Sequence, residues 1–129
     1  MTLQVTSLIA GLFAFMMVIL SLQVSMRRFK VRTVFGDAGD NTLRRRTRAH
    51  GNFIEYAPTA LIVLGLVEAG GGSSLLVWSL GIAFFLSRVL HAVGMLYTST
   101  PTVRAVAMTI MHAAFLLSAG WLVFGFIKL

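Results

Sequence analysis

The 129 residues suffice for one domain, and a mean hydropathy of +0.87 with only 12% charged residues favours a membrane protein over a soluble one. The net charge of +7 does not indicate nucleic-acid binding, because eight of the eleven Lys and Arg residues lie between Arg27 and Arg48. The sequence contains no cysteine, which excludes disulfides, thiolate metal sites and a cysteine nucleophile.

The first predicted element is a membrane-spanning helix over residues 2–28. Residues 1–26 carry no charge, and about 20 apolar residues cross the roughly 30 Å hydrocarbon core of a bilayer. A cleaved signal peptide is the alternative, but it would place basic residues before the apolar run. Here the first basic residue is Arg27, so we expect a retained span followed by a loop over residues 29–42.

The second predicted helix covers residues 43–68, and its uncharged stretch, residues 56–67, has only 12 residues. That stretch is too short to span a bilayer alone. The span is long enough only if the polar segment 44–55 is also helical and lies partly inside the protein. We therefore expect its polar side chains to face a cavity or a partner.

Two further spans follow, over residues 74–97 and residues 101–128. Pro101 and the residues before it are typical of a helix N-terminus. The predicted fold is therefore an all-α four-transmembrane-helix bundle that forms one domain, residues 1–129. Because the basic residues gather around the first loop, we expect that loop in the cytoplasm and both termini on the opposite side, in the inner membrane if the chain is bacterial.

The densest group of polar residues lies at the start of the second span. At 100° per residue, four polar residues lie on one face of this helix: Arg48, Asn52, Glu55 and Tyr56. This polar stripe is about 12 Å long. Ionisable side chains at membrane depth are costly unless they meet a polar partner. The stripe is either an internal Arg48–Glu55 network that ties helices together or a site for a zwitterionic or polyacidic ligand, and its four polar types favour the ligand.

Four residues of the other helices need the same explanation. Arg28 ends the first helix and is either an interfacial anchor or part of the site. Arg88 and His91 are neighbours on the third helix, where Arg88 is either a buried structural residue that bonds neighbouring carbonyls or Glu55, or a ligand contact. Arg104 lies in the first turn of the fourth helix, where the dipole disfavours a cation. It is either an interfacial anchor or the holder of an anion such as a thiolate.

His112 lies about two turns deeper than Arg104 on the fourth helix. We interpret it as a hydrogen-bonded packing histidine. Haem ligation by His91 and His112 is the alternative, but nothing in the sequence makes the two face each other. No metal site is predicted.

The polar stripe of the second predicted helix also resembles a known family. Its sequence pattern is Arg48-x-x-x-Asn52-x-x-Glu55-Tyr56-x-Pro58. Preceded by a basic loop and set among four short spans, it resembles the MAPEG family, which includes microsomal glutathione transferases and leukotriene C synthase. Arg88-Val-Leu-His91 resembles the family's third helix, and Arg104 the start of its fourth, so the resemblance covers essentially the whole chain.

This resemblance implies a homotrimer that holds glutathione as co-substrate between neighbouring subunits, on the cytoplasmic side. The residues that would bind it are Arg28 from the adjacent subunit, Arg48, Asn52, Glu55, Tyr56, Arg88 and His91. Arg104 would be the catalytic residue, because it would lower the pKa of the thiol and hold the thiolate for attack on a lipophilic electrophile. The other expected partner is membrane lipid.

Two positions depart from the family's pattern. Met95 stands where members often have a tyrosine, and Ala105 where prostaglandin E synthase-like members have a serine. The departures disfavour an isomerase, so we expect a glutathione-dependent membrane transferase or peroxidase. The alternatives are a non-catalytic lipid-binding or scaffold protein of the same fold, and a small proton-coupled exporter, which the position of Glu55 among basic residues disfavours.

Overall fold

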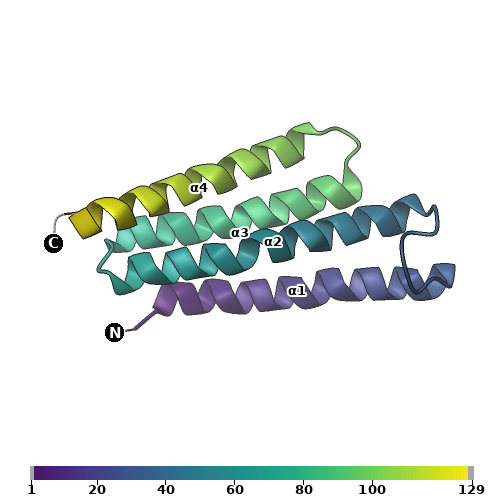
Figure 1. Ribbon diagram of the computed structural model, residues 1–129, viewed down its shortest axis with the longest axis horizontal. Helices are drawn as coiled ribbons and strands as arrows, with labels where there is room; N and C mark the ends of the chain where they lie inside the picture. Colours follow the sequence, from purple (N-terminus) through teal and green to yellow (C-terminus); the bar gives the residue numbers. More distant parts are fainter. Residues whose placement is uncertain (1, 128–129) are drawn as a thin grey trace.

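The computed structural model describes residues 2–127 and consists of four long helices with short connections (Figure 1). The helices are α1 (Gln4–Val31), α2 (Asn41–Ala69), α3 (Ser74–Tyr97) and α4 (Thr102–Ile127). Each is long and apolar enough to cross a membrane. The four predicted membrane helices are therefore confirmed.

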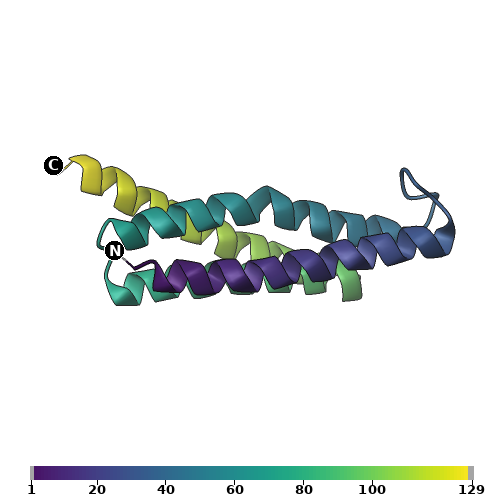
Figure 2. The same ribbon diagram turned by 90° about the horizontal axis from the view of Figure 1, so that it is seen from below.

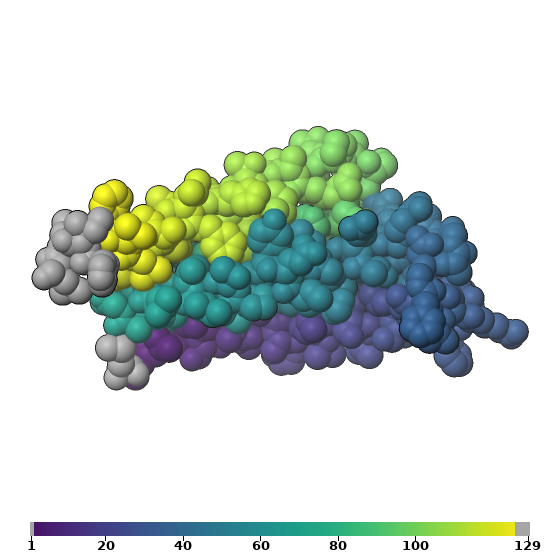
Figure 3. Space-filling view, in the orientation of Figure 1, coloured from purple at the N-terminus to yellow at the C-terminus, as the bar shows by residue number. Residues whose placement is uncertain are grey.

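Successive helices run in opposite directions, so the start of α1 and the end of α4 lie at the same end of the bundle (Figure 1). The other end carries the α1–α2 loop, residues 32–40, and the α3–α4 connection. We call it the basic end, because the basic residues from Arg27 to Arg48 gather there. α2 and α3 each contact all three other helices. Figure 3 shows α2 between α1 and α4 on one face, and Figure 2 shows α4 inclined to its neighbours.

The core follows from the helical period of small and apolar residues. The buried residues of the middle of α2 recur every three or four positions: Ala49, Phe53, Ala57, Ala60 and Leu64. Phe53 packs edge-on against Phe13 of α1, with ring centroids 5.4 Å apart. Between helices in lipid, such close packing replaces the hydrophobic effect as the stabilising force.

α1 lies further along the chain than predicted, since it begins at Gln4 rather than at residue 2 and ends at Val31 rather than at residue 28. The prediction ended the helix at its first basic residues. Arg28 and Lys30 instead occupy the last turn, where the negative end of the helix dipole favours cations. The helix stops at Arg32, whose left-handed φ of 54° lets its N–H bond the Phe29 carbonyl.

α2 begins two residues earlier than predicted, at Asn41, so the loop covers residues 32–40 rather than 29–42. The cause is Asp40, whose carboxylate caps the helix by accepting a hydrogen bond from the Leu43 N–H at 2.6 Å. α2 then continues through the polar segment and through Pro58 to Ala69. Its helical polar segment supplies the length that the short apolar stretch lacks.

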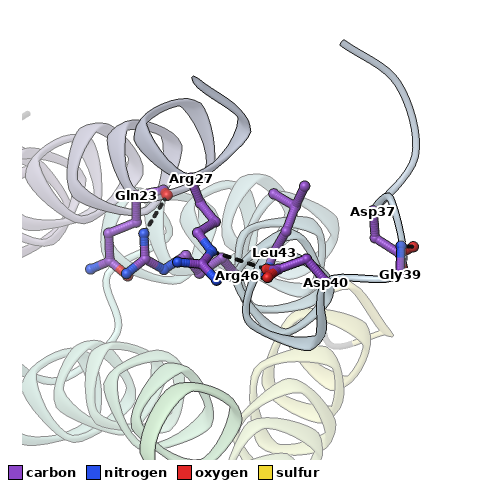
Figure 4. Close-up of polar contacts among 7 residues, drawn as sticks. All are labelled: Gln23, Arg27, Asp37, Gly39, Asp40, Leu43 and Arg46. Atoms are coloured by element: carbon purple, nitrogen blue, oxygen red, sulfur yellow. Dashed lines mark hydrogen bonds and ion pairs between the residues drawn. The ribbon is translucent and has the colours of Figure 1, made fainter. Parts of the chain in front are cut away.

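Asp40 also ties α2 to α1 (Figure 4). Its Oδ2 lies 2.6 Å from Nη2 of Arg27, and its Oδ1 accepts from Nε of Arg27 at 3.0 Å. The hydrogen bond from Arg27, followed by that from the Leu43 N–H, lowers the pKa of Asp40 to about 2. The carboxylate is therefore charged at neutral pH and closes the loop onto both helices.

α4 begins at Thr102 rather than at residue 101. The Pro101 carbonyl accepts the Ala105 N–H at 2.9 Å, as a residue that precedes the first turn does. The predicted last residue of this helix, residue 128, lies outside the described residues.

Candidate functional site

A polar pocket of about 350 Å³ lies between α2 and α3 toward the basic end. Its lining residues are Thr47, Arg48, Gly51, Asn52, Glu55, His91 and Met95. We call it the α2–α3 pocket. Three residues of the predicted stripe share this cavity, because positions four and seven apart recur on one helix face.

Arg48 and Glu55 are both exposed in the single chain, and within residues 2–127 no ion pair forms between them. The internal network considered as an alternative is therefore absent from the described part of the chain. A guanidinium and a carboxylate facing lipid on a membrane-spanning helix are costly. This face is thus suited to a polar ligand or to a second chain.

Arg88 is the most buried charged residue, with 1% of its surface exposed. Its Nη1 donates to Oδ1 of Asn52 at 2.5 Å, and its guanidinium carbon lies 4.9 Å from the centre of the Tyr56 ring. The remaining contacts are with Ser87 and Met108. The alternative in which Arg88 bonds Glu55 is wrong, since all its recorded partners are neutral.

Burying a cation that has no carboxylate partner is costly unless other groups offset its positive charge. In residues 2–127 the ion pair that forms is Arg27–Asp40, near the basic end. Arg88 does not itself line the pocket; it orients Asn52, which does. Arg88 therefore contacts the pocket through the amide of Asn52, while the Tyr56 ring covers its guanidinium outside the pocket lining.

Tyr56, the fourth residue of the stripe, is half-buried and packs against the core. One side of its ring faces Arg88, and His112 of α4 lies edge-on at 6.2 Å between ring centroids. The prediction of a buried, hydrogen-bonded His112 is wrong for the single chain, since this side chain is exposed and the Tyr56 ring is its aromatic contact among the described residues. The cause is its helix face, which turns outward past Tyr56. His91 is buried and lines the pocket, so the two histidines do not share it.

Arg104 reaches the pocket through Met95. Its Nη1 lies 3.4 Å from the Met95 sulfur, and its Nε is buried without a hydrogen-bond partner among the described residues. Gly94 permits this approach of α3 to α4, because a Cβ there would lie 2.8 Å from Cγ of Arg104. Met95, noted from the sequence as a departure, is thus the contact between the guanidinium and the cavity.

Arg28 is not brought to the α2–α3 pocket within its own chain. Its Nη1 donates to the carbonyls of Val34 and Gly36, each at 3.0 Å. It lines a separate hollow at the α1–α2 loop. A role for Arg28 in the pocket of an adjacent subunit stays a prediction.

Sequence reasoning missed Arg45, which fastens α2 to the end of α3. Its Nε donates to the Met95 carbonyl at 2.6 Å, and its Nη2 donates to the Thr98 carbonyl. Helical spacing could have indicated it, because Arg45 lies three residues before Arg48.

In residues 2–127, no three His, Asp or Glu residues gather in a way that could hold a metal ion.

Comparison with known proteins identifies relatives over most of the chain. Residues 6–124 match the MAPEG family. The inner membrane protein YecN of Escherichia coli (strain K12) is 32% identical over 91 residues, which are 70% of this chain and 70% of YecN. YecN of Escherichia coli O6:H1 matches to the same extent. No solved structure matches.

Proposed function

The chain belongs to the MAPEG family, and from this premise we propose that it is a glutathione-dependent membrane transferase or peroxidase. It is an integral membrane protein. Glutathione binds in the α2–α3 pocket as a co-substrate. The second substrate is a lipophilic electrophile that arrives from the bilayer.

The observation that carries this proposal is the surplus of positive charge around the pocket. Arg48 lines it, Arg88 adjoins it through Asn52, and Arg104 adjoins it through Met95, whereas Glu55 is the one carboxylate in its lining. Glutathione carries two carboxylates and one ammonium group. Its carboxylates complement the arginines and its ammonium complements Glu55, and a thiolate would cancel the one positive charge that is left.

Arg104 supplies the chemistry of the thiol. A guanidinium near the start of a helix stabilises a thiolate, so the thiol of glutathione loses its proton to solvent at a lower pH than in water. In conjugation, the thiolate sulfur forms a bond to the electrophilic carbon, and the leaving group departs with its electron pair. In peroxide reduction, two glutathiones are oxidised to the disulfide while the peroxide becomes an alcohol and water.

The same proposal includes a homotrimer, in which Arg28 of one subunit reaches the pocket of the next. The exposed Arg48 and Glu55 support it, because a neighbouring chain would remove them from lipid. The basic end faces the cytoplasm, following the distribution of Lys and Arg. The start of α1 and the end of α4 then lie on the opposite side.

Calorimetry with the full chain in detergent tests glutathione binding directly. We expect Arg48→Ala and Glu55→Ala to weaken binding at least about ten-fold, since each removes a charge-assisted contact. The matched control is Arg44→Ala, an exposed arginine of α2 that bonds Asn41 and lies outside the pocket. Absence of binding by the folded wild-type protein would contradict the proposal.

Two further measurements separate its parts. Native mass spectrometry is expected to show the mass of three chains. Assays with an aryl halide and with a lipid hydroperoxide test turnover. Binding of glutathione without turnover of either substrate would contradict the catalytic part and leave a non-catalytic protein of the same fold.

A further inference from the structure

An apolar groove runs between α1 and α3 from the middle of the bundle to the basic end, with a volume of about 320 Å³. All but two of its lining residues lack a polar group, and those two, Gln23 and Tyr97, lie at the basic end. From Leu12 to Gln23, α1 rises about 16 Å, which is about half of the roughly 30 Å hydrocarbon core. The groove therefore has the length of the acyl chain of one leaflet.

A second pocket, of about 330 Å³, continues this groove at the basic end. The two cavities share Gln23, Leu96 and Tyr97. The rest of the second cavity is polar and is lined by Asn41, Thr42, Arg45 and Arg46. An apolar groove that ends in amide, hydroxyl and guanidinium groups matches a molecule with a hydrocarbon chain and an anionic head.

Among the described residues, the two arginines of this cavity donate to backbone carbonyls and not to carboxylates. Arg45 donates to the carbonyls of Met95 and Thr98, and Nη1 of Arg46 donates to the Gln23 carbonyl at 2.9 Å (Figure 4). These acceptors are neutral, and each guanidinium has five N–H donors.

Asp40, the acidic residue at this end of α2, is already engaged by Arg27 through two hydrogen bonds. It therefore offsets chiefly Arg27, and its Coulombic interaction with Arg46 is the smallest of the effects that lower its pKa. Arg27, Arg45 and Arg46 carry three positive charges against the single negative charge of Asp40, so a net charge of two remains for an anion.

We propose that the groove and the polar cavity together bind one anionic phospholipid. One acyl chain lies in the groove, and the phosphate lies beside Arg45 and Arg46. Tyr97, 76% exposed, stands at the level of the headgroup, where tyrosine is enriched in membrane proteins. Each arginine near the headgroup should raise the affinity for an anionic lipid about five-fold relative to a zwitterionic one.

This lipid site is separate from the α2–α3 pocket and does not depend on the glutathione proposal. It uses the face of α3 that carries Val89 and Ala92, whereas His91 and Met95 line the other pocket. A second copy of the chain is a poorer occupant. The sequence has 11 basic and 4 acidic residues, so a neighbouring copy packed against this groove would bring few carboxylates to Arg45 and Arg46.

Native mass spectrometry of the full chain in detergent tests the proposal, with phosphatidylglycerol and phosphatidylcholine added at equal concentration. We expect more phosphatidylglycerol than phosphatidylcholine to be retained, and Arg46→Gln to reduce the retained phosphatidylglycerol about five-fold. Arg44→Gln, two residues earlier in α2 and outside the cavity, is the matched control and should leave retention unchanged.

A second pair of variants tests the acyl-chain groove. Val89→Trp fills it and should reduce retention of both lipids, whereas Leu86→Trp, an exposed residue of α3 outside the groove, should not. Thermal unfolding verifies that the variants fold, and Ile19→Trp on the facing wall of α1 replaces Val89→Trp if that variant does not.

Three results would overturn the lipid site. The first is equal retention of the two lipids together with unchanged retention in the Arg46 and groove variants. The second is displacement of phosphatidylglycerol by glycerol phosphate, which has no acyl chain and would indicate a site for free phosphate. The third is a groove variant that lowers the mass of the oligomer without loss of lipid, which would assign the groove to a contact between copies.

Discussion

Glu68 at the end of α2 holds Thr6 at the start of α1 by two hydrogen bonds to one carboxylate oxygen. Its Oε2 accepts from the Thr6 N–H at 2.8 Å and from the Thr6 hydroxyl at 2.6 Å, while Oε1 accepts from the Val5 N–H at 3.0 Å. The N-cap residue of α1, Leu3, provides no side-chain cap. A carboxylate of another helix thus satisfies the free N–H groups of the first turn and interacts favourably with its dipole.

We expect Glu68→Ala to lower the free energy of unfolding by about 2 kcal/mol, because it removes a cap and leaves N–H groups without acceptors. Thr6→Val removes only the hydroxyl bond and should have the smaller effect. Thermal unfolding in detergent measures both, with Thr59→Val, an exposed threonine of α2, as the control. Equal stability of Glu68→Ala and wild type would show that the cap is unimportant.

The pair of Asp40 and Arg27 makes stability depend on pH in the acid range. The folded state lowers the pKa of Asp40 from 3.8 to about 2, chiefly through the hydrogen bond from Arg27. The unfolded state therefore binds the proton more readily, so the contribution of Asp40 is fully present above about pH 4 and is lost as pH falls through about 2.

This contribution is measured by comparing wild type with Asp40→Asn from pH 6 to pH 2. The difference between their unfolding midpoints should be constant above pH 5 and should shrink as the pH approaches 2. Asp37→Asn is the control, because the Asp37 carboxylate accepts a hydrogen bond from the Gly39 N–H within the loop and, among the described residues, bonds neither helix. A difference that stays constant down to pH 2 would assign the role of Asp40 to helix capping alone.

The sequence was sufficient for those features that one helix determines by itself. Hydropathy located the four spans, and the helical period placed Arg48, Asn52 and Glu55 on one face, as they are in the α2–α3 pocket. The sequence located the helix ends within a few residues but did not indicate the cap at Asp40. Capping depends on the conformation of the Asp40 side chain, which the neighbouring residues of the chain do not determine.

Contacts between helices were not predictable in the same way. Glu68 and Thr6 are 62 residues apart, and their contact depends on how α1 and α2 align along the bundle. The exposure of His112 depends likewise on the rotation of α4 against Tyr56. A single sequence contains no signal for either alignment, so these contacts required the three-dimensional structure.

Gly94 controls how closely α4 approaches α3 at Arg104. A Cβ at this position would lie 2.8 Å from Cγ and 3.2 Å from the backbone N of Arg104, and the backbone cannot move aside easily. We expect Gly94→Ala to destabilise the fold by about 1–3 kcal/mol. Gly11→Ala in α1, which meets open space, should be neutral or stabilising by up to about 1 kcal/mol. Similar effects of both variants in thermal unfolding would contradict this close approach.

Asn52→Asp tests whether Arg88 lacks an internal counter-charge. The new carboxylate would take the place of the amide oxygen that lies 2.5 Å from Nη1 of Arg88. We expect a higher unfolding midpoint, because a buried cation gains an anion, together with glutathione binding weakened at least about ten-fold. Asn52→Ala should weaken binding without raising the midpoint. A lower midpoint for Asn52→Asp would show that Arg88 is already compensated.

Arg104→Ala tests the assignment of the thiolate. Glutathione bound as a thiolate has an ultraviolet absorption band that the thiol lacks, and we expect this band when glutathione is added to the wild-type protein. In Arg104→Ala the apparent pKa of the bound thiol should rise by one unit or more, since the guanidinium that stabilises the anion is removed.

The binding of glutathione measured by calorimetry should fall much less in Arg104→Ala than in Arg48→Ala, because the peptide backbone and charged ends of glutathione keep their contacts. Arg104→Lys retains a charge without the planar fork and should recover part of the band. A band of equal intensity in Arg104→Ala, with glutathione still bound, would remove Arg104 from the catalytic assignment.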